Sequence, residues 1–117
     1  MKTVKKIVVT TVLGIVVAAT VAAPAGAATY NASASLGAKS CKSNQYIYSN
    51  ATLVGVAAEG YINQTKSGTT KSTGWFKMSG AVAKNYSASW YTFSSSVAIV
   101  SSPNAGPSVK SFTYSCK

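Results

Sequence analysis

The residue pattern after position 28 is the feature that most restricts the fold of this chain. Apolar periodicity of the kind that marks an amphipathic helix is missing there. Ser, Thr, Val, Tyr, Trp and Phe dominate instead, with polar and apolar residues in alternation and turn residues about every 8–15 positions. Because β-branched and aromatic residues favour extended backbone, the pattern predicts an all-β domain.

Seven segments have the alternation expected of strands, and "PNAGP" (103–107) is the strongest loop signal between them. The expected strands cover 29–35, 44–50, 51–63, 69–78, 86–93, 96–102 and 108–116. Gly55 and Gly60 interrupt the third segment and predict a bend or bulge. A chain of about six to eight short strands is typical of a small antiparallel two-sheet sandwich or a small barrel.

Two cysteines, Cys41 and Cys116, lie near the two ends of the predicted domain. An even cysteine number in an exported chain favours one disulfide. This bond would fasten the last strand near the first, across a loop of about 76 residues, which the chain-entropy treatment credits with roughly 4 kcal/mol.

The first 28 residues have the pattern of a signal peptide. Lys2, Lys5 and Lys6 precede an uncharged, mostly apolar run, and the small-residue stretch "APAGAA" (23–28) follows. Cleavage is expected after Ala27 or Ala28, which would leave one secreted domain, 29–117, without a transmembrane segment. The apolar run is shorter than the roughly 18–20 residues that a membrane span prefers.

The charge of the chain is strongly one-sided. All eleven basic residues are lysines, and Glu59 is the single acidic residue. Without the three lysines of the signal peptide, eight lysines and one glutamate remain, a net charge of +7. Such a domain is attracted to anionic cell walls or lipid headgroups. A specific nucleic-acid partner is not expected, because arginine is absent and the lysines are dispersed.

The residue types needed for most enzyme chemistry are missing from the sequence. It contains no histidine, aspartate or arginine. This excludes Ser-His-Asp and Cys-His catalysis, paired carboxylates, and the usual ligand sets of zinc and calcium. We therefore expect no catalytic residues, no metal and no cofactor.

Alternation in "TKSTGWFKMSG" (70–80) suggests a contact face. In a strand, Trp75 and Lys77 would point to one side, and Phe76 and Met78 to the other. Burying Lys77 without an acidic partner is costly, so the second pair is expected in the core. The candidate binding face is then Lys71, Trp75 and Lys77, where an indole and ammonium groups suit a sugar ring or a phosphate headgroup.

The second aromatic pair, Trp90 and Tyr91, lies in "YSASWYTF" (86–93). In a strand, one side of this segment would carry Tyr86, Ala88 and Trp90. Burying these three side chains costs little free energy, because none of them is charged. Trp90 is therefore predicted in the core, and Trp75 at the surface. In the last strand, the side that carries Phe112 is predicted to point inward.

The stretch "TKSG…STGWFKMSGAVAKNYSASWYTF" (65–93) resembles the lactococcin-like β-sandwich bacteriocins. The similar features are the Thr-Lys turn, a Gly-Trp strand that carries Lys77, and an aromatic strand ending near Phe93. The resemblance implies an exported protein that binds the cell-wall precursor lipid II and blocks septum formation. The cysteine pair, the segment 96–117 and the lack of histidine depart from that family's pattern.

These features together predict a secreted, basic, non-enzymatic protein that binds an anionic component of the cell envelope, with bacteriocin-like antimicrobial action as the finer expectation. The alternative is a structural or adhesive surface protein whose lysines only keep it soluble.

Overall fold

The computed structural model describes residues 30–117, so the predicted signal peptide and its cleavage sites lie outside the described residues. The described residues form eight β-strands and no helix, which confirms the all-β prediction. The strands are β1 Tyr30–Leu36, β2 Lys39–Ser40, β3 Ile47–Lys66, β4 Thr69–Ser72, β5 Phe76–Tyr86, β6 Thr92–Phe93, β7 Ser95–Ser102 and β8 Ser108–Cys116.

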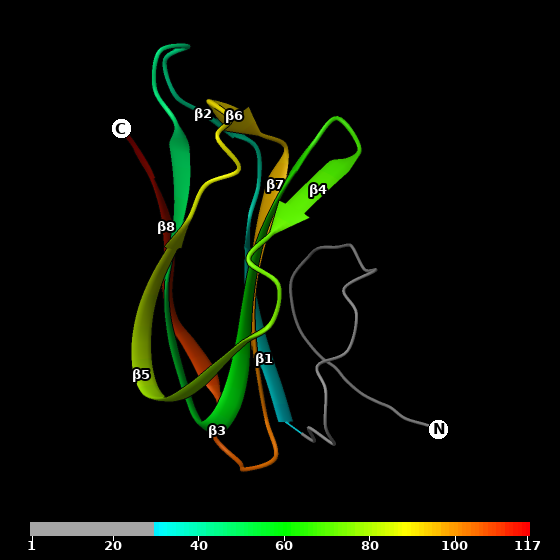
Figure 1. Ribbon diagram of the computed structural model, residues 1–117, viewed down its shortest axis with the longest axis vertical. Coiled ribbons are helices and arrows are strands. Elements are labelled where there is room, and N and C mark those ends of the chain that lie inside the picture. The colour runs from blue at the N-terminus through cyan, green and yellow to red at the C-terminus, as the bar shows by residue number, and fades with distance from the viewer. Residues whose placement is uncertain (1–29) are drawn as a thin grey trace.

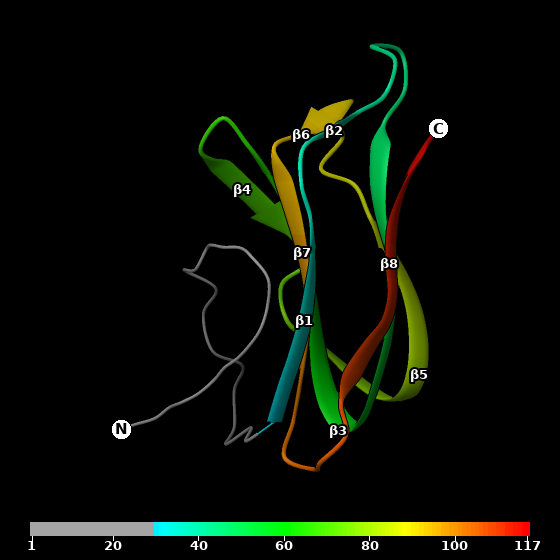
Figure 2. The same cartoon turned by 180° about the vertical axis from the view of Figure 1, so that it is seen from behind.

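The sheets are antiparallel, and β3 is at their centre. Six strands form one sheet in which β1 pairs with β7 and β7 with β3, while β4, β5 and β8 also pair with β3; β2 and β6 form a second, two-stranded sheet. Figure 1 shows the large sheet folded into two layers, with β5 and β8 on one side and β1, β4 and β7 on the other. Figure 2 shows the same layers from behind.

The fold into two layers is made by a bulge within β3. Its first half, up to Val54, lies between β5 and β8, whereas the segment from Glu59 onward pairs with β7. The pairing with β5 shifts between Gly55 and Ala58, where Ala57 has a left-handed φ of 47°. Between these pairs β3 has one residue more than β5, and this extra residue exchanges the two sides of the strand, because side chains alternate along it. The expected interruption at Gly55 is thus confirmed, and the two segments predicted as 44–50 and 51–63 are one strand of 20 residues.

The core lies between the two layers. Leu53 from the first half of β3 meets Ile62 from the second half, and both side chains are fully buried. The central cluster also contains Ala51, Ala58, Met78, Ala98 and Val100, with Ala32, Phe76, Val82, Tyr86, Val109 and Phe112 packed against it. Phe112 and Met78 therefore lie where the sequence predicted. Val109 joins Phe112 in the core because the β3–β8 register shifts between Thr52 and Leu53.

Gly60 leaves the space that the Phe76 ring occupies. A Cβ at position 60 would lie 2.6 Å from Cζ of Phe76 and 2.8 Å from Cδ1 of Leu53. Gly60 is directly opposite Phe76 in the β3–β5 pairing. This glycine is therefore required by packing and does not bend the strand.

A buried amide joins several strands inside the sandwich. Gln64 is fully buried, and the two hydrogens of its Nε2 are shared among three acceptors: the carbonyl oxygen of Ile47 (3.2 Å), Oγ of Ser49 (3.0 Å) and the carbonyl oxygen of Tyr86 (3.2 Å). Its Oε1 accepts from the backbone N–H of Ala88 at 3.0 Å. One side chain thus ties both halves of β3 to the end of β5 and to the irregular segment that follows it.

The segment predicted as a strand over 86–93 is mostly irregular. Only Tyr86, at the end of β5, and the two residues of β6, Thr92 and Phe93, are in strands. Ser89 has a φ of 66°, which breaks the alternation. Phe93, with 1% of its surface exposed, is the buried aromatic of this segment, and Trp90 is only half-buried. The prediction that Trp90 is a core residue is therefore wrong.

Partial burial raises the pKa of the Tyr86 phenol, and the charge of Tyr61 adds to the rise.

The packing at Gly60 predicts that Gly60→Ala lowers the free energy of unfolding by about 1–3 kcal/mol, because the added methyl group forces Phe76 and Leu53 apart. Gly37→Ala is the matched control, since a Cβ there has nothing within 4 Å. Urea unfolding of both variants measures the difference. Equal stabilities of the two variants would contradict the packing.

Replacing Gln64 by methionine, which has a similar length, removes every hydrogen bond of the buried amide. We expect a loss of stability on the order of 3 kcal/mol, because the buried Ala88 N–H and the Ser49 hydroxyl lose a partner. Gln45→Met is the control, since Oε1 of Gln45 accepts one exposed bond from the Lys42 N–H. A melting temperature of the Gln64→Met variant equal to that of the control would show that the amide has no structural role.

Candidate functional site

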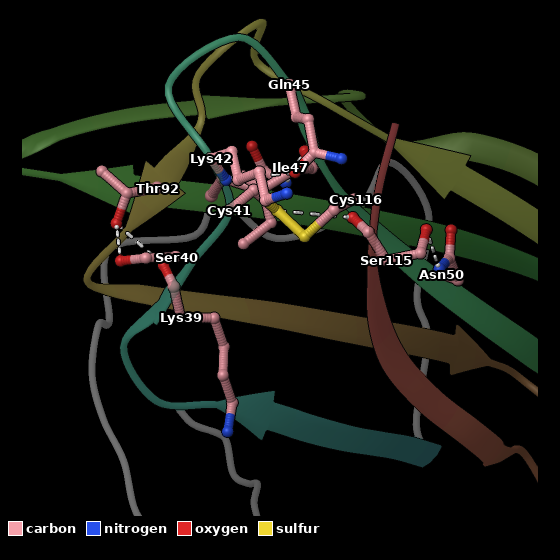
Figure 3. The surroundings of a disulfide bond; sticks show 11 residues. Lys39, Ser40, Cys41, Lys42, Gln45, Ile47, Asn50, Thr92, Ser115 and Cys116 are labelled. Carbon is pink, nitrogen blue, oxygen red and sulfur yellow. Dashed lines mark hydrogen bonds between the residues drawn. A yellow bond between two sulfur atoms is a disulfide. The ribbon is translucent and has the colours of Figure 1, made fainter.

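The predicted disulfide is present and fastens one end of the sandwich. Cys41 and Cys116 are bonded, with their Cα atoms 5.7 Å apart. Next to the bond, Tyr46 and Lys117 exchange backbone hydrogen bonds of 2.7 and 3.0 Å. Figure 3 shows the bridge joining the segment after β2 to the end of β8. The end of the chain is thereby held against the start of β3.

The same end holds the irregular aromatic segment in place. The Cys41 N–H donates to the carbonyl oxygen of Tyr91, and the Ile47 N–H donates to that of Trp90, both at 2.8 Å. Beside them, the hydroxyl of Thr92 donates to the Lys39 carbonyl oxygen at 2.8 Å (Figure 3). The backbone of Trp90 and Tyr91 is thus held by bonds from two separate segments.

Two lysines lie over these two rings. Nζ of Lys66 is 5.8 Å from the centroid of Trp90 and 5.4 Å from that of Tyr91. Nζ of Lys71 is 5.6 Å from the centroid of Trp90. Both lysines come from the β3–β4 hairpin, so the contact joins residues that are about 20 positions apart in sequence. Such cation–π contacts contribute about 0.5–1 kcal/mol each at exposed sites.

Two further pairs of the same kind lie at this end. Nζ of Lys39 is 5.4 Å from the centroid of Tyr114, and Nζ of Lys117 is 5.4 Å from that of Tyr48. We call the eight side chains the lysine–aromatic end: Lys39, Lys66, Lys71, Lys117, Tyr48, Trp90, Tyr91 and Tyr114. Glu59, the single acidic residue of the sequence, is not among them. The ammonium groups therefore contact the faces of aromatic rings and no carboxylate side chain of this set. Because a ring does not neutralise their charge, each ammonium group can still pair with an anion.

The three residues of the predicted binding face do not lie together. Trp75 and Lys77 are on the outer side of the sheet, where the ring centroids of Trp75 and Tyr61 are 5.1 Å apart. Lys77 stands opposite Glu59 in the register of β5 and β3. Lys71 is opposite Gln64, on the inner side of the sheet, and reaches Trp90 instead.

A break in the predicted strand 69–78 explains this separation. β4 ends at Ser72 and β5 begins at Phe76, and between them Gly74 has a φ of 69°. The alternation of sides that linked Lys71 to Trp75 is lost at this break. From Phe76 onward the prediction agrees with the structure, since Lys77 is exposed and Met78 is buried. Trp75, predicted at the surface, is half-buried.

Sequence reasoning missed the pairing of lysines with rings at the disulfide end. The partners come from distant segments, so no local spacing reveals them. A usable signal was the excess of lysine over acid together with tyrosines near both cysteines, such as Tyr46, Tyr48 and Tyr114. Lysines without carboxylate partners are expected to find aromatic faces.

Comparison of the chain with protein-family models, with curated proteins and with solved structures finds no match. Within residues 30–117 no group of three or more His, Cys, Asp or Glu side chains is placed to hold a metal ion. The same residues contain no helix of the length and apolar character that would cross a bilayer. Function is therefore inferred from the lysine–aromatic end itself.

Removing the disulfide should lower the free energy of unfolding by about 4 kcal/mol, because the bond closes a loop of roughly 76 residues in the unfolded chain. The measurement compares thermal unfolding of the wild type and of the Cys41→Ser/Cys116→Ser variant, each with and without a reductant. The wild type should lose stability on reduction, whereas the variant should be insensitive to it. A wild type that melts alike in both states would contradict a stabilising bond.

Proposed function

We propose that this chain is an exported, non-enzymatic protein that binds an anionic component of the cell envelope through its lysine–aromatic end. The observation that carries the proposal is that four lysines lie over four aromatic rings at one end of the fold. An anion that approaches this end meets ammonium groups without a competing side-chain carboxylate. The surplus of positive charge also attracts such ligands over longer distances.

Export is supported by the signal-peptide pattern of residues 1–28 and by the Cys41–Cys116 disulfide, which suits an oxidising compartment. The absence of histidine, aspartate and arginine from the sequence supports a binding role over catalysis. The resemblance of 65–93 to lactococcin-like bacteriocins supports the finer proposal of an antimicrobial that acts on neighbouring cells. Inhibition of their growth by the purified protein tests that finer proposal separately.

A binding assay with isolated cell walls tests the proposal. The exported, oxidised protein should bind at low salt and be released as the salt concentration rises to about 0.5 M, because ions screen the attraction. The variant Lys66→Gln/Lys71→Gln should bind at least about tenfold more weakly, since each lysine near an anionic surface contributes about 1 kcal/mol.

The matched control is Lys77→Gln/Lys110→Gln, which removes the same charge from two exposed lysines outside the lysine–aromatic end. It should retain most of the wild-type affinity. If the control variant instead loses the binding, the contact face includes Lys77 or Lys110 and the lysine–aromatic end is not the binding site. If the wild type does not bind even at low salt, the alternative of a surface protein whose lysines only solubilise it is favoured.

A further inference from the structure

Two of the four rings of the lysine–aromatic end are open to solvent, whereas Tyr48 and Trp90 are half-buried. Tyr91 and Tyr114 are 42% and 41% exposed, and Tyr46, beside the disulfide, is 51% exposed. The single aliphatic side chain of comparable size and exposure in residues 30–117 is Val56, in the bulge of β3 at the opposite end of the sandwich. This end of the molecule thus displays three exposed rings accompanied by lysines. The one other ring of comparable exposure in residues 30–117 is Tyr30, at the start of β1, which is 46% exposed.

These side chains are distributed around the whole end and do not follow one strand. The β4 hairpin, which supplies Lys71, lies on one side in Figures 1 and 2, and the C-terminal residue Lys117 lies on the other side, with β2 and β6 between them. An extended polymer would contact neighbours along a line. A surface, by contrast, offers contacts to groups on both sides of this end.

We propose that the ligand is an anionic phospholipid bilayer, on which the protein stands end-on through its lysine–aromatic end. This inference rests on the proposed function and names its ligand. Tyr and Trp rings prefer the level of the headgroups, where the ring is partly desolvated and its polar tip stays wet. The lysines then pair with the lipid phosphates while keeping their contacts with the rings.

The contacts at this end fix its backbone conformation before a ligand binds. The disulfide and the bonds from the Cys41 and Ile47 N–H groups hold Trp90 and Tyr91 before any ligand is present. Binding to a surface therefore requires little ordering of the backbone, which lowers the entropic cost of association. End-on docking also places Trp75, on the outer side of the sheet beside Tyr61, away from the bilayer.

The two tryptophans of the chain make this orientation measurable. Trp75→Phe leaves Trp90 as the single tryptophan, and Trp90→Phe leaves Trp75. Both full-length oxidised proteins are titrated with vesicles of phosphatidylglycerol and phosphatidylcholine, and with vesicles of phosphatidylcholine alone. The emission of Trp90 should shift to shorter wavelength and be quenched by brominated lipid on the anionic vesicles, whereas Trp75 should show neither change. Affinity for the neutral vesicles should be at least about tenfold weaker.

A response of Trp75, alone or with Trp90, would overturn the end-on orientation. Equal responses to anionic and neutral vesicles would overturn the role of the phosphates' charge. Soluble poly(glycerol phosphate) is the competitor: if it shifts Trp90 and displaces the protein from vesicles, the ligand is a polymer and the bilayer assignment is wrong. Binding to cell walls without binding to any vesicle would likewise overturn the bilayer assignment and leave the proposed function standing. If Trp90→Phe fails to fold, Trp75→Phe still reports on Trp90.

Discussion

The bulge in β3 is the constraint on which the rest of the structure depends. One strand of 20 residues belongs to both layers, and it can do so because the left-handed residue Ala57 exchanges its two sides between Gly55 and Ala58. Before the bulge the odd-numbered residues up to Leu53 point into the core, and after it the even-numbered ones from Ala58 do. The two buried faces of the same strand thus cover each other, with Gln64 bonded back to Ile47 and Ser49 across the core.

This arrangement brings both ends of β3 to the same end of the molecule. Ile47 is there beside the disulfide, and Lys66 is there at the start of the β4 hairpin. Since the sequence has one acidic residue, lysines that gather at this end cannot be neutralised by carboxylate side chains. They lie over Tyr48, Trp90, Tyr91 and Tyr114 instead. The way in which the core is closed therefore brings lysines and aromatic rings together at one end of the fold.

Much of the fold could be predicted because it depends on local pattern. Alternation identified β1, β7 and β8, and the number and positions of the cysteines identified the disulfide. The cost of burying Lys77 correctly placed Phe76 and Met78 against the core. Two local breaks escaped prediction, since Ser89 and Gly74 adopt left-handed conformations that end the alternation. Because of the break at Ser89, Phe93 and not Trp90 is buried in the core. Because of the break at Gly74, Lys71 and Trp75 lie on different sides of the sheet. The lysine–ring pairs were beyond prediction because they depend on the tertiary arrangement.

Amide chemical shifts of the isotopically labelled, oxidised protein give the most direct test of the claim that the lysine–aromatic end binds anions. The protein is titrated with nanodiscs that contain phosphatidylglycerol and, in a parallel sample, with poly(glycerol phosphate). The largest shift changes or line broadening should fall in residues 39–48, 66–71, 90–92 and 114–117. Changes concentrated instead around Tyr61 and residues 75–77, or the absence of any change at low salt, would contradict the account.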